Sequence, residues 1–253
     1  MTWLQVWTET AQIVKPTRYA VGVVARHSCA AGLNSAVPPT FTIPSPRTDV
    51  RTSHTSEKMP DMADTNRLKS FVRDFTDLID DVGSDESRIL NRGAPLLANL
   101  IAHDDWLPDP FSEPHPDHYQ QYLLYCDPRE RFSVVSFVWG PGHETPIHDH
   151  TVWGLVGILR GAERNTEYTR DEAAGAPTAG AAELCSVGDV TKVSPTIGDI
   201  HRVSNVSDAP SVSIHVYGAN IGKVERRVYD EATGSEQSFI SGYTSDVLPN
   251  IWS

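Results

Sequence analysis

GHETPIHDHTVWGLVGILRG, residues 142–161, is the stretch of this chain that decides its fold. It lies between two runs rich in β-branched and aromatic residues, so the pattern predicts a strand, a turn and a second strand. Side chains two residues apart on a strand point to the same face, which brings His148 and His150 together and turns Asp149 away. Two imidazoles on one rigid element would form half of a metal site.

The chain on both sides of this stretch predicts further strands. Short apolar runs alternate with Gly, Pro, Asp and Asn turns, a spacing that predicts an antiparallel sandwich or barrel. The Ala- and Gly-rich segment 171–182 is expected to be a mobile loop. The expected strands are Tyr119–Tyr125, Phe132–Trp139, His148–Ile158, Arg164–Thr169, Glu183–Val187, Val190–Val193, His201–Asn205 and Ser211–Tyr217.

Two helices are expected before the strands. Residues 66–81 place apolar side chains at three- and four-residue spacing, as an amphipathic helix does, and Thr65 is the expected N-cap. A second helix is expected over residues 84–102, where Gly93 and Pro95 should split it. Both helices are expected to pack against the outside of the strands.

Residues 1–61 differ in composition from the rest of the chain. Pro, Ser and Thr are frequent and no apolar periodicity persists, a composition that predicts disorder. One interpretation is an organelle-targeting segment, which the basic start favours and Glu9 opposes. The preferred one is a translated upstream extension, with Met59 or Met62 as the natural start.

Composition narrows the class of protein. The 253 residues carry a formal net charge of −12 without a cluster of Lys and Arg, which argues against nucleic acid and favours a small substrate. No run of eighteen apolar residues is present, so no membrane span is expected. The cysteines, Cys29, Cys126 and Cys185, are far apart and odd in number, which predicts a reducing, cytoplasmic location.

A third imidazole stands fifty residues beyond the first pair. His201 follows a Pro- and Gly-containing turn in the stretch 188–205 and opens an expected strand. Distant strands of a jelly roll face each other across its interior, so His201 can complete a triangle with His148 and His150. The alternative is a surface histidine that caps a turn.

These two stretches resemble the motifs of the cupin superfamily. The pattern Gly-x5-His-x-His-x3-Gly-x6-Gly in residues 142–161 is similar to the first cupin motif, with Gly154 where many cupins place a Glu ligand. Residues 188–205 are similar to the second motif with two one-residue insertions. The resemblance implies a mainly β cupin jelly-roll barrel with the N-terminal helices packed outside. Three neutral imidazoles would leave a divalent ion its full charge, which attracts an anionic thiolate.

Three longer runs resemble a narrower family. Residues 137–142, 145–154 and 211–222 are similar to the thiol dioxygenases of the cysteine dioxygenase family, and especially to its bacterial branch acting on 3-mercaptopropionate. The similarity begins at about residue 63 and reaches the C-terminus. It implies one thiol dioxygenase domain over 62–253, with helices in 65–102 and the barrel in 118–230.

The resemblance also implies a metal site and a relay. The metal would be non-haem Fe(II), held by the three histidines that match by position, His148, His150 and His201. The relay would consist of Ser213, His215 and Tyr217. At i, i+2 and i+4 on one strand, these three side chains share a face, so they can form a hydrogen-bonded chain if that face is the barrel interior. The alternative is an ordinary strand whose polar face meets solvent.

Two departures from the animal enzymes bear on the substrate. Those enzymes carry a Cys that crosslinks to the active-site Tyr, whereas Gly154 stands at the matching position, so no thioether to Tyr217 is expected. The cysteine-specific members hold the substrate carboxylate with an Arg where Gln121 stands here. The 3-mercaptopropionate type uses an Arg after the relay strand, matched by Arg226, with Arg227 as its rival. A guanidinium can bind a carboxylate in a bidentate manner.

The resemblance therefore implies oxidation of a small carboxylate thiol, 3-mercaptopropionate first, by O2 to the sulfinate. Arg226 and Tyr217 would hold the carboxylate. Cysteine or mercaptosuccinate is the alternative substrate, because an altered pocket could favour either one without a change of ligands. A cupin binding module or a metal-dependent isomerase on the same barrel is the third hypothesis. The oligomeric state is left open.

Overall fold

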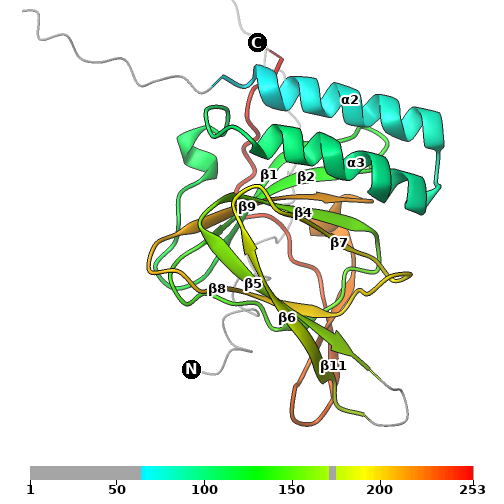
Figure 1. Ribbon diagram of the computed structural model, residues 1–253, viewed down its shortest axis with the longest axis vertical. Helices are drawn as coiled ribbons and strands as arrows, with labels where there is room; N and C mark the ends of the chain where they lie inside the picture. Colours follow the sequence, from blue (N-terminus) through cyan, green and yellow to red (C-terminus); the bar gives the residue numbers. More distant parts are fainter. Residues whose placement is uncertain (1–63, 171–174, 253) are drawn as a thin grey trace, which may run out of the picture. The chain divides into compact units, whose positions relative to one another are not determined.

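Two antiparallel sheets face each other in the computed structural model, which describes residues 64–170 and 175–252 (Figure 1). The expected extension 1–61 and part of the expected loop, 171–174, lie outside the described residues. The first sheet has the order β1 (Gln120–Cys126), β2 (Ser133–Trp139), β9 (Ser211–Tyr217), β4 (Gly154–Arg160) and β7 (Val190–Val193). The second has the order β11 (Glu236–Phe239), β10 (Arg226–Tyr229), β3 (Ile147–His148), β8 (His201–Asn205), β5 (Ala162–Thr169) and β6 (Thr178–Ser186).

This arrangement confirms a mainly β jelly-roll barrel with helices outside it. Each sheet mixes strands from distant parts of the chain, because successive strands cross between the two layers. The helices α2 (Asn66–Val82) and α3 (Glu86–Ile101) cover the outer face of the first sheet (Figure 1). None of the helices in the described part of the chain is long and apolar enough to cross a membrane.

Helix α2 forms where its apolar periodicity predicts it. Its buried side chains recur every three or four residues and face α3 and the first sheet: Leu68, Phe71, Val72, Phe75, Leu78, Ile79 and Val82. The expected cap is wrong in its detail, since Thr65 makes no side-chain capping bond. Asp64 accepts the backbone N–H of Asn66 instead, at 3.1 Å. The helix ends at Gly83, whose φ of 63° only glycine adopts without strain.

Helix α3 is continuous, so the expected split at Gly93 and Pro95 is wrong. Asp85 caps the helix by accepting the backbone N–H of Arg88 at 3.0 Å. Pro95 removes one helical hydrogen bond, yet the helix runs through it because its inner face is held by packing. Gly93 lies on that face, where a Cβ would come within 2.9 Å of the Phe75 ring. The missing side chain thus allows α3 to approach α2 closely.

The barrel buries two distinct apolar layers. Even-numbered residues of β9, such as Ile214 and Val216, belong to the cluster beneath the helices. Odd-numbered ones point between the two sheets, where Tyr217 joins Phe137 and Trp139. All seven residues of β9 are buried, so its polar side chains lie inside the barrel rather than in solvent.

Three strand expectations differ from the structure. The expected strand 148–158 is broken, because β3 ends at His148 and β4 begins at Gly154. Strand β6 begins at Thr178, so the end of the expected loop is in fact a strand. Strands β10 and β11 were not predicted, since four-residue strands with charged side chains show no clear alternation.

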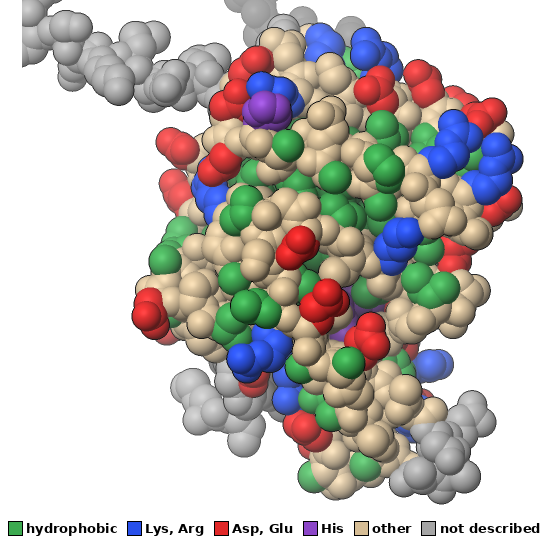
Figure 2. Space-filling model, viewed as in Figure 1, with side chains coloured by type: hydrophobic (Ala, Val, Ile, Leu, Met, Phe, Trp, Pro, Cys, Tyr) green, Lys and Arg blue, Asp and Glu red, His purple; other side chains and the backbone are tan. Residues whose placement is uncertain are grey.

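On the face shown in Figure 2, acidic and basic side chains are interspersed.

Candidate metal centre and substrate pocket

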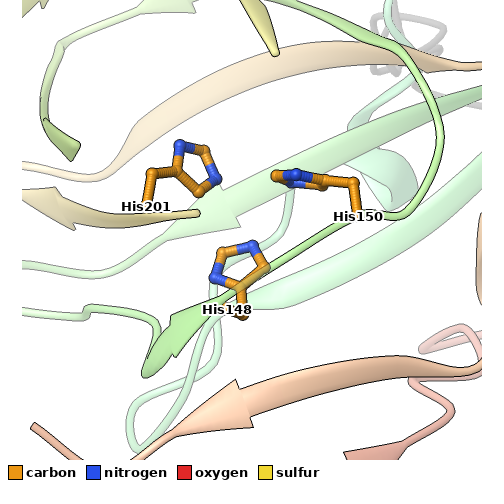
Figure 3. A group of neighbouring side chains, drawn as sticks. All are labelled: His148, His150 and His201. Carbon is orange, nitrogen blue, oxygen red and sulfur yellow. The ribbon is translucent and has the colours of Figure 1, made fainter. Parts of the chain in front are cut away.

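Three imidazoles converge inside the barrel, as Figure 3 shows. His148 on β3 and His201 at the start of β8 are directly opposite each other in an antiparallel pair. His150 lies after the end of β3, and one ring nitrogen from each of the three residues lies within 4.8 Å of the others. The arrangement is that of a site that can hold a metal ion. The expectation that His148 and His150 share one strand is wrong, although their rings do meet.

The loop after β3 turns His150 inward because a carboxylate holds it. Thr151 adopts a φ of 60°, a conformation rare outside glycine, so the chain reverses sharply at this point. Asp199 accepts the backbone N–H groups of His150 and Thr151 at 3.1 and 3.0 Å, and its Oδ1 lies 3.0 Å from Nδ1 of His150. Asp199 was not predicted. Its place in the turn two residues before His201 is the one signal that could have indicated it.

Each imidazole is fixed through its outer nitrogen. Nδ1 of His148 lies 3.1 Å from the carbonyl oxygen of Pro146, and Nδ1 of His201 lies 2.8 Å from Oδ1 of Asn165. With Nδ1 acting as the donor in these bonds, Nε2 keeps its lone pair for a metal ion. Nε2 of His150 is buried without a hydrogen-bond partner among the described residues, as an absent ligand bond would leave it.

The electrostatics of the cluster also fit a metal ion. Burial lowers the pKa of His148 and of His201 well below 6.5, and the neighbouring imidazoles lower both further. Neutral imidazoles are the form that binds metal. Imidazole suits iron, zinc, copper and nickel alike, so the donor set fits a divalent transition metal without choosing among them.

Asp149 points away from the cluster, as expected. Its carboxylate accepts the backbone N–H of Arg227 at 2.8 Å and the hydroxyl of Tyr229 at 2.7 Å, both on β10. The side chain is buried, so these bonds fix the backbone between the two histidines to the neighbouring strand.

Ser213, His215 and Tyr217 form a continuous buried chain on β9. The Ser213 hydroxyl lies 2.9 Å from Nε2 of His215, and Nδ1 of His215 lies 2.7 Å from the Tyr217 hydroxyl. Trp139 donates its indole N–H to Ser213 at 3.2 Å. Burial lowers the pKa of His215 well below 6.5 and raises that of Tyr217. The Tyr217 ring stacks on the ring of His150, with centroids 5.5 Å apart, so the chain ends beside the histidine cluster.

One pocket brings His215 and Tyr217 together with His148, His201 and the buried cation of Arg226. Arg226 is 3% exposed, donates from Nη2 to Ser241 at 2.7 Å, and has its centre 4.7 Å from the ring of Phe239. Its Nε is buried without a hydrogen-bond partner, and it forms no ion pair, within the part of the chain that the structure describes. Burial lowers the pKa of Arg226. The pocket is lined by Tyr119, Gln121, Phe137, Trp139, Thr145, His148, His201, Val203, His215, Tyr217, Arg226 and Phe239.

Arg226 and Arg227 lie on opposite faces of β10. The Arg227 side chain is 53% exposed, and its Nε lies 3.9 Å from Glu236. Only Arg226 therefore enters the pocket. Gln121 is buried beside it and donates to the Ser241 hydroxyl at 3.1 Å and to the carbonyl of Gly242 at 3.0 Å. Ser241 thus bridges Gln121 and Arg226, a role that nothing in its sequence context indicates.

Gly154 is opposite Tyr217 in the pairing of β4 with β9. A Cβ at this position would meet the Tyr217 ring at 2.9 Å, so close packing against the ring demands glycine. The described cysteines, Cys126 and Cys185, are free and lie on β1 and β6. No thiol in the described part of the chain is therefore placed beside Tyr217.

Residues 116–231 match the sequence profile of the family described as Cysteine dioxygenase type I. Cysteine dioxygenase type 1 of Bos taurus is 26% identical over 118 residues, which cover 46% of this chain and 58% of the relative. The protein of the same name from Danio rerio is 30% identical over 109 residues, covering 41% and 52%. The chain thus spans little more than half the length of these curated relatives.

Solved structures with a similar arrangement are more distant. A cupin-2 domain from Rhodospirillum rubrum is 16% identical with a TM-score of 0.36, over 46% of this chain and 68% of that one. A protein with a double-stranded β-helix domain from Klebsiella pneumoniae is 18% identical with a TM-score of 0.35, over 47% and 93%.

Proposed function

We propose that this chain is a non-haem Fe(II) thiol dioxygenase of the cysteine dioxygenase family. Its substrate would be a small thiol that carries a carboxylate, with 3-mercaptopropionate as the first candidate, and its product the sulfinate. The observation that carries the proposal is the content of one pocket, in which two of the three converging histidines and the unpaired Arg226 line the same cavity. The sequence match over residues 116–231 supports the choice of reaction.

His148, His150 and His201 would hold the metal through their inner nitrogens. When bound, iron would supply coordination of a thiolate and activation of dioxygen. Asp199, Asn165 and the carbonyl of Pro146 hold the three imidazoles in place through Nδ1, so the three donors would be preorganised for a metal ion. No carboxylate belongs to the cluster, which leaves the site its positive charge for an anionic sulfur.

Arg226 would bind the carboxylate of the substrate. A guanidinium that is buried without an anionic partner is destabilised, and a carboxylate both pairs with the charge and fills its hydrogen bonds. Gln121 and Tyr217 line the same pocket and can donate to the second carboxylate oxygen. The acid end would therefore be held at one side of the pocket and the sulfur directed toward the histidines.

The lining of the pocket favours a substrate without an ammonium group. Apart from Arg226 its lining is neutral, and no Asp or Glu among the described residues takes part in it. The ammonium of cysteine would find no carboxylate there, whereas 3-mercaptopropionate has no such group to satisfy. Phe137, Trp139 and Phe239 cover the apolar walls, along which the methylene groups of the thiol would lie.

Cysteine is the second candidate substrate, because the matched family profile and both relatives carry cysteine dioxygenase in their names. Mercaptosuccinate is less well suited, since its second carboxylate would have to share the single buried cation of the pocket.

Oxygen uptake by the purified, iron-loaded chain tests the proposal. We expect uptake that depends on thiol and yields the sulfinate, with kcat/KM highest for 3-mercaptopropionate among the three thiols. A higher kcat/KM for cysteine would move the assignment to cysteine dioxygenase. Absence of uptake with every carboxylate thiol, in a sample with full iron content, would contradict the proposed function.

A further inference from the structure

A buried acid lies behind the Ser213–His215–Tyr217 chain and is not used in the proposed reaction. Gly161, with a φ of 73°, turns the chain from β4 in the first sheet to β5 in the second. This turn carries Glu163 into the space between the sheets, opposite Ser211, and the residue is only 1% exposed. A buried carboxyl in such a place needs a physical reason.

The carboxyl of Glu163 has few partners. Ser211 donates to Oε1 at 3.1 Å, whereas Oε2 is buried without a hydrogen-bond partner among the described residues. None of the ion pairs in this part of the chain includes Glu163. A buried carboxylate with no cation and one unsatisfied oxygen is costly, and protonation removes both the charge and the need for a cation.

The surroundings favour the neutral acid. Burial raises the pKa of Glu163 to about 8, and the neighbouring hydroxyls of Ser213 and Ser211 have a smaller, opposing effect on it. The titratable groups that interact with it are Cys185, its pairing partner on β6, and the phenol of Tyr217 on β9. Asn205, its pairing partner on β8, carries no charge. Burial, the unpartnered Oε2 and the lack of a cation among the described ion pairs together favour the protonated side chain near neutral pH.

The direction of each hydrogen bond between Ser213, His215 and Tyr217 then follows from a count of donors and acceptors. The Ser213 hydroxyl has one proton and two lone pairs, and the indole N–H of Trp139 takes one lone pair. A neutral Glu163 with its proton on the unpartnered Oε2 can donate to the other, and the Ser213 proton then goes to Nε2 of His215. The neutral imidazole then has its proton on Nδ1 and donates it to the oxygen of Tyr217.

We propose that Glu163 is a positioning residue, which acts as a neutral acid on Ser213 and so leaves the Tyr217 hydroxyl proton free to point at the substrate carboxylate. The inference rests on the proposed function and extends it by one residue. An ionised Glu163 would accept the Ser213 proton, which reverses both bonds of His215. Tyr217 would then donate to His215 and lose its proton as a donor to the substrate.

The first test compares pH profiles of oxygen uptake for Glu163→Gln and Glu163→Leu. The amide can donate to Ser213 and accept from Ser211 as the neutral acid does, but it cannot ionise. We expect wild-type kcat/KM to fall as the pH rises through about 8, and this fall to be absent in Glu163→Gln. Glu163→Leu should lose roughly ten-fold at pH 7, about the effect of one buried hydrogen bond in a network.

Matched changes at Glu183, which is exposed on the adjacent strand β6, are the controls. Glu183→Gln and Glu183→Leu should keep the wild-type profile and rate. An alkaline fall that persists in Glu163→Gln would overturn the inference, as would full activity of Glu163→Leu with a wild-type profile.

Infrared spectroscopy gives a readout independent of the reaction. A carboxylic acid carbonyl band should be present in the full-length wild-type protein at pH 7 and disappear as the pH rises through about 8. The band should be absent in Glu163→Gln and retained in Glu183→Gln. If the wild-type protein lacks the band at pH 7, the inference is wrong. If the band titrates as expected while no thiol is oxidised, the proposed function fails and the assignment of the buried proton stands.

Discussion

At the scale of single residues, Arg226 and Arg227 are neighbours in the sequence but lie in different environments. Arg226 is buried and has no anionic partner among the described residues, whereas Arg227 next to it is 53% exposed and lies near Glu236. Strand alternation explains the difference, and it is the reason that one of two adjacent cations enters the pocket.

Replacement of Arg226 by Gln should raise KM for 3-mercaptopropionate roughly ten- to hundred-fold, because a hydrogen bond to a charged group contributes about 1.5–3 kcal/mol. Steady-state kinetics of oxygen uptake measures the change. Arg227→Gln is the matched control and should leave KM within about two-fold of wild type. Equal effects at both positions would contradict the assignment of Arg226.

Replacement of Asn165 by Ala should weaken metal binding about ten- to hundred-fold, the usual effect of losing the hydrogen bond that orients a histidine ligand. The reason is that Asn165 holds Nδ1 of His201 at 2.8 Å. Competition with a chelator of known affinity measures the change. Arg164→Ala, one residue earlier on the exposed face of β5, should bind metal as wild type does. Unchanged affinity in Asn165→Ala would show that His201 needs no such support.

The sequence indicated the residues of the site better than the residues that support them. His148, His201 and the side chains of β9 stand in motifs with fixed spacing. Asp199, Asn165 and Ser241 make their contacts across 15 to 120 positions of the chain, and no local pattern indicates such partners. Support of this kind depends on how the strands are ordered in the sheets.

At the scale of elements, a loop rather than a strand completes the histidine cluster. Period-two spacing correctly brought His148 and His150 together but for the wrong reason, since β3 ends at His148. The turn at Thr151 and the bonds to Asp199 direct His150 inward. Apolar periodicity predicted α2 and most strands, because it reports which face is buried. It could not predict the continuity of α3, which depends on packing against α2 and β4.

Gly93 on α3 gives a test of that packing. Gly→Ala in a helix usually stabilises by about 1 kcal/mol, but the added methyl would lie 2.9 Å from the Phe75 ring and 3.0 Å from Leu155. We expect Gly93→Ala to lower the free energy of unfolding by roughly 1–3 kcal/mol, as overpacking does. Urea denaturation measures it, and Ser87→Ala on the exposed face of α3 is the control. If Gly93→Ala were more stable than the wild type, α3 must have moved to make room for the methyl group, and the overpacking argument would be wrong.

A second test concerns the ion-pair link between α2 and the turn that joins β1 to β2. Arg131 bonds Asp127 at 2.8 Å and also pairs with Asp80 on α2, and the Asp127 side chain is 3% exposed. The hydrogen bond from Arg131 lowers the pKa of Asp127 below its usual value. Because the folded pKa is depressed, the contribution to stability is present above the unfolded pKa and is lost as the pH falls through the folded one.

Arg131→Leu should therefore lower the free energy of unfolding by about 3 kcal/mol near pH 6, since it leaves a buried carboxylate without its partner. The difference from wild type should shrink as the pH falls below about 4, where Asp127 becomes protonated in the unfolded state and then in the folded state. Denaturation curves over this pH range measure both effects. Arg129→Leu, whose side chain is 72% exposed, should change stability little at any pH.

At the scale of the whole described barrel, the two faces of the first sheet have separate roles. One face is covered by α2 and α3 and supplies most of the apolar core, while the other faces the second sheet and carries the polar side chains of the site. The class of fold could be predicted from strand spacing and the two motifs. The edge of the second sheet could not be predicted, because β10 and β11 are short and depend on pairing with distant parts of the chain: β10 pairs with β3, and β11 pairs with β10.

Metal binding should stabilise the whole barrel, because its ligands come from β3, the loop after it and β8. Metal at about 100 times its dissociation constant adds about 2.7 kcal/mol, which corresponds to roughly 5–10 °C in Tm for a domain of this size. Calorimetry of iron-loaded and chelator-treated protein measures the shift. His201→Ala should retain no iron after dialysis and show no shift. Iron retention by that variant would remove His201 from the ligand set.

Gly154, which lies opposite Tyr217, bears on whether that tyrosine is chemically modified. Cys126 and Cys185, the two thiols among the described residues, lie on β1 and β6, so neither is placed to crosslink to that ring. If the chain has the proposed activity and this ring stays unmodified, a newly folded copy should work at full rate from its first turnover, without an activating self-modification.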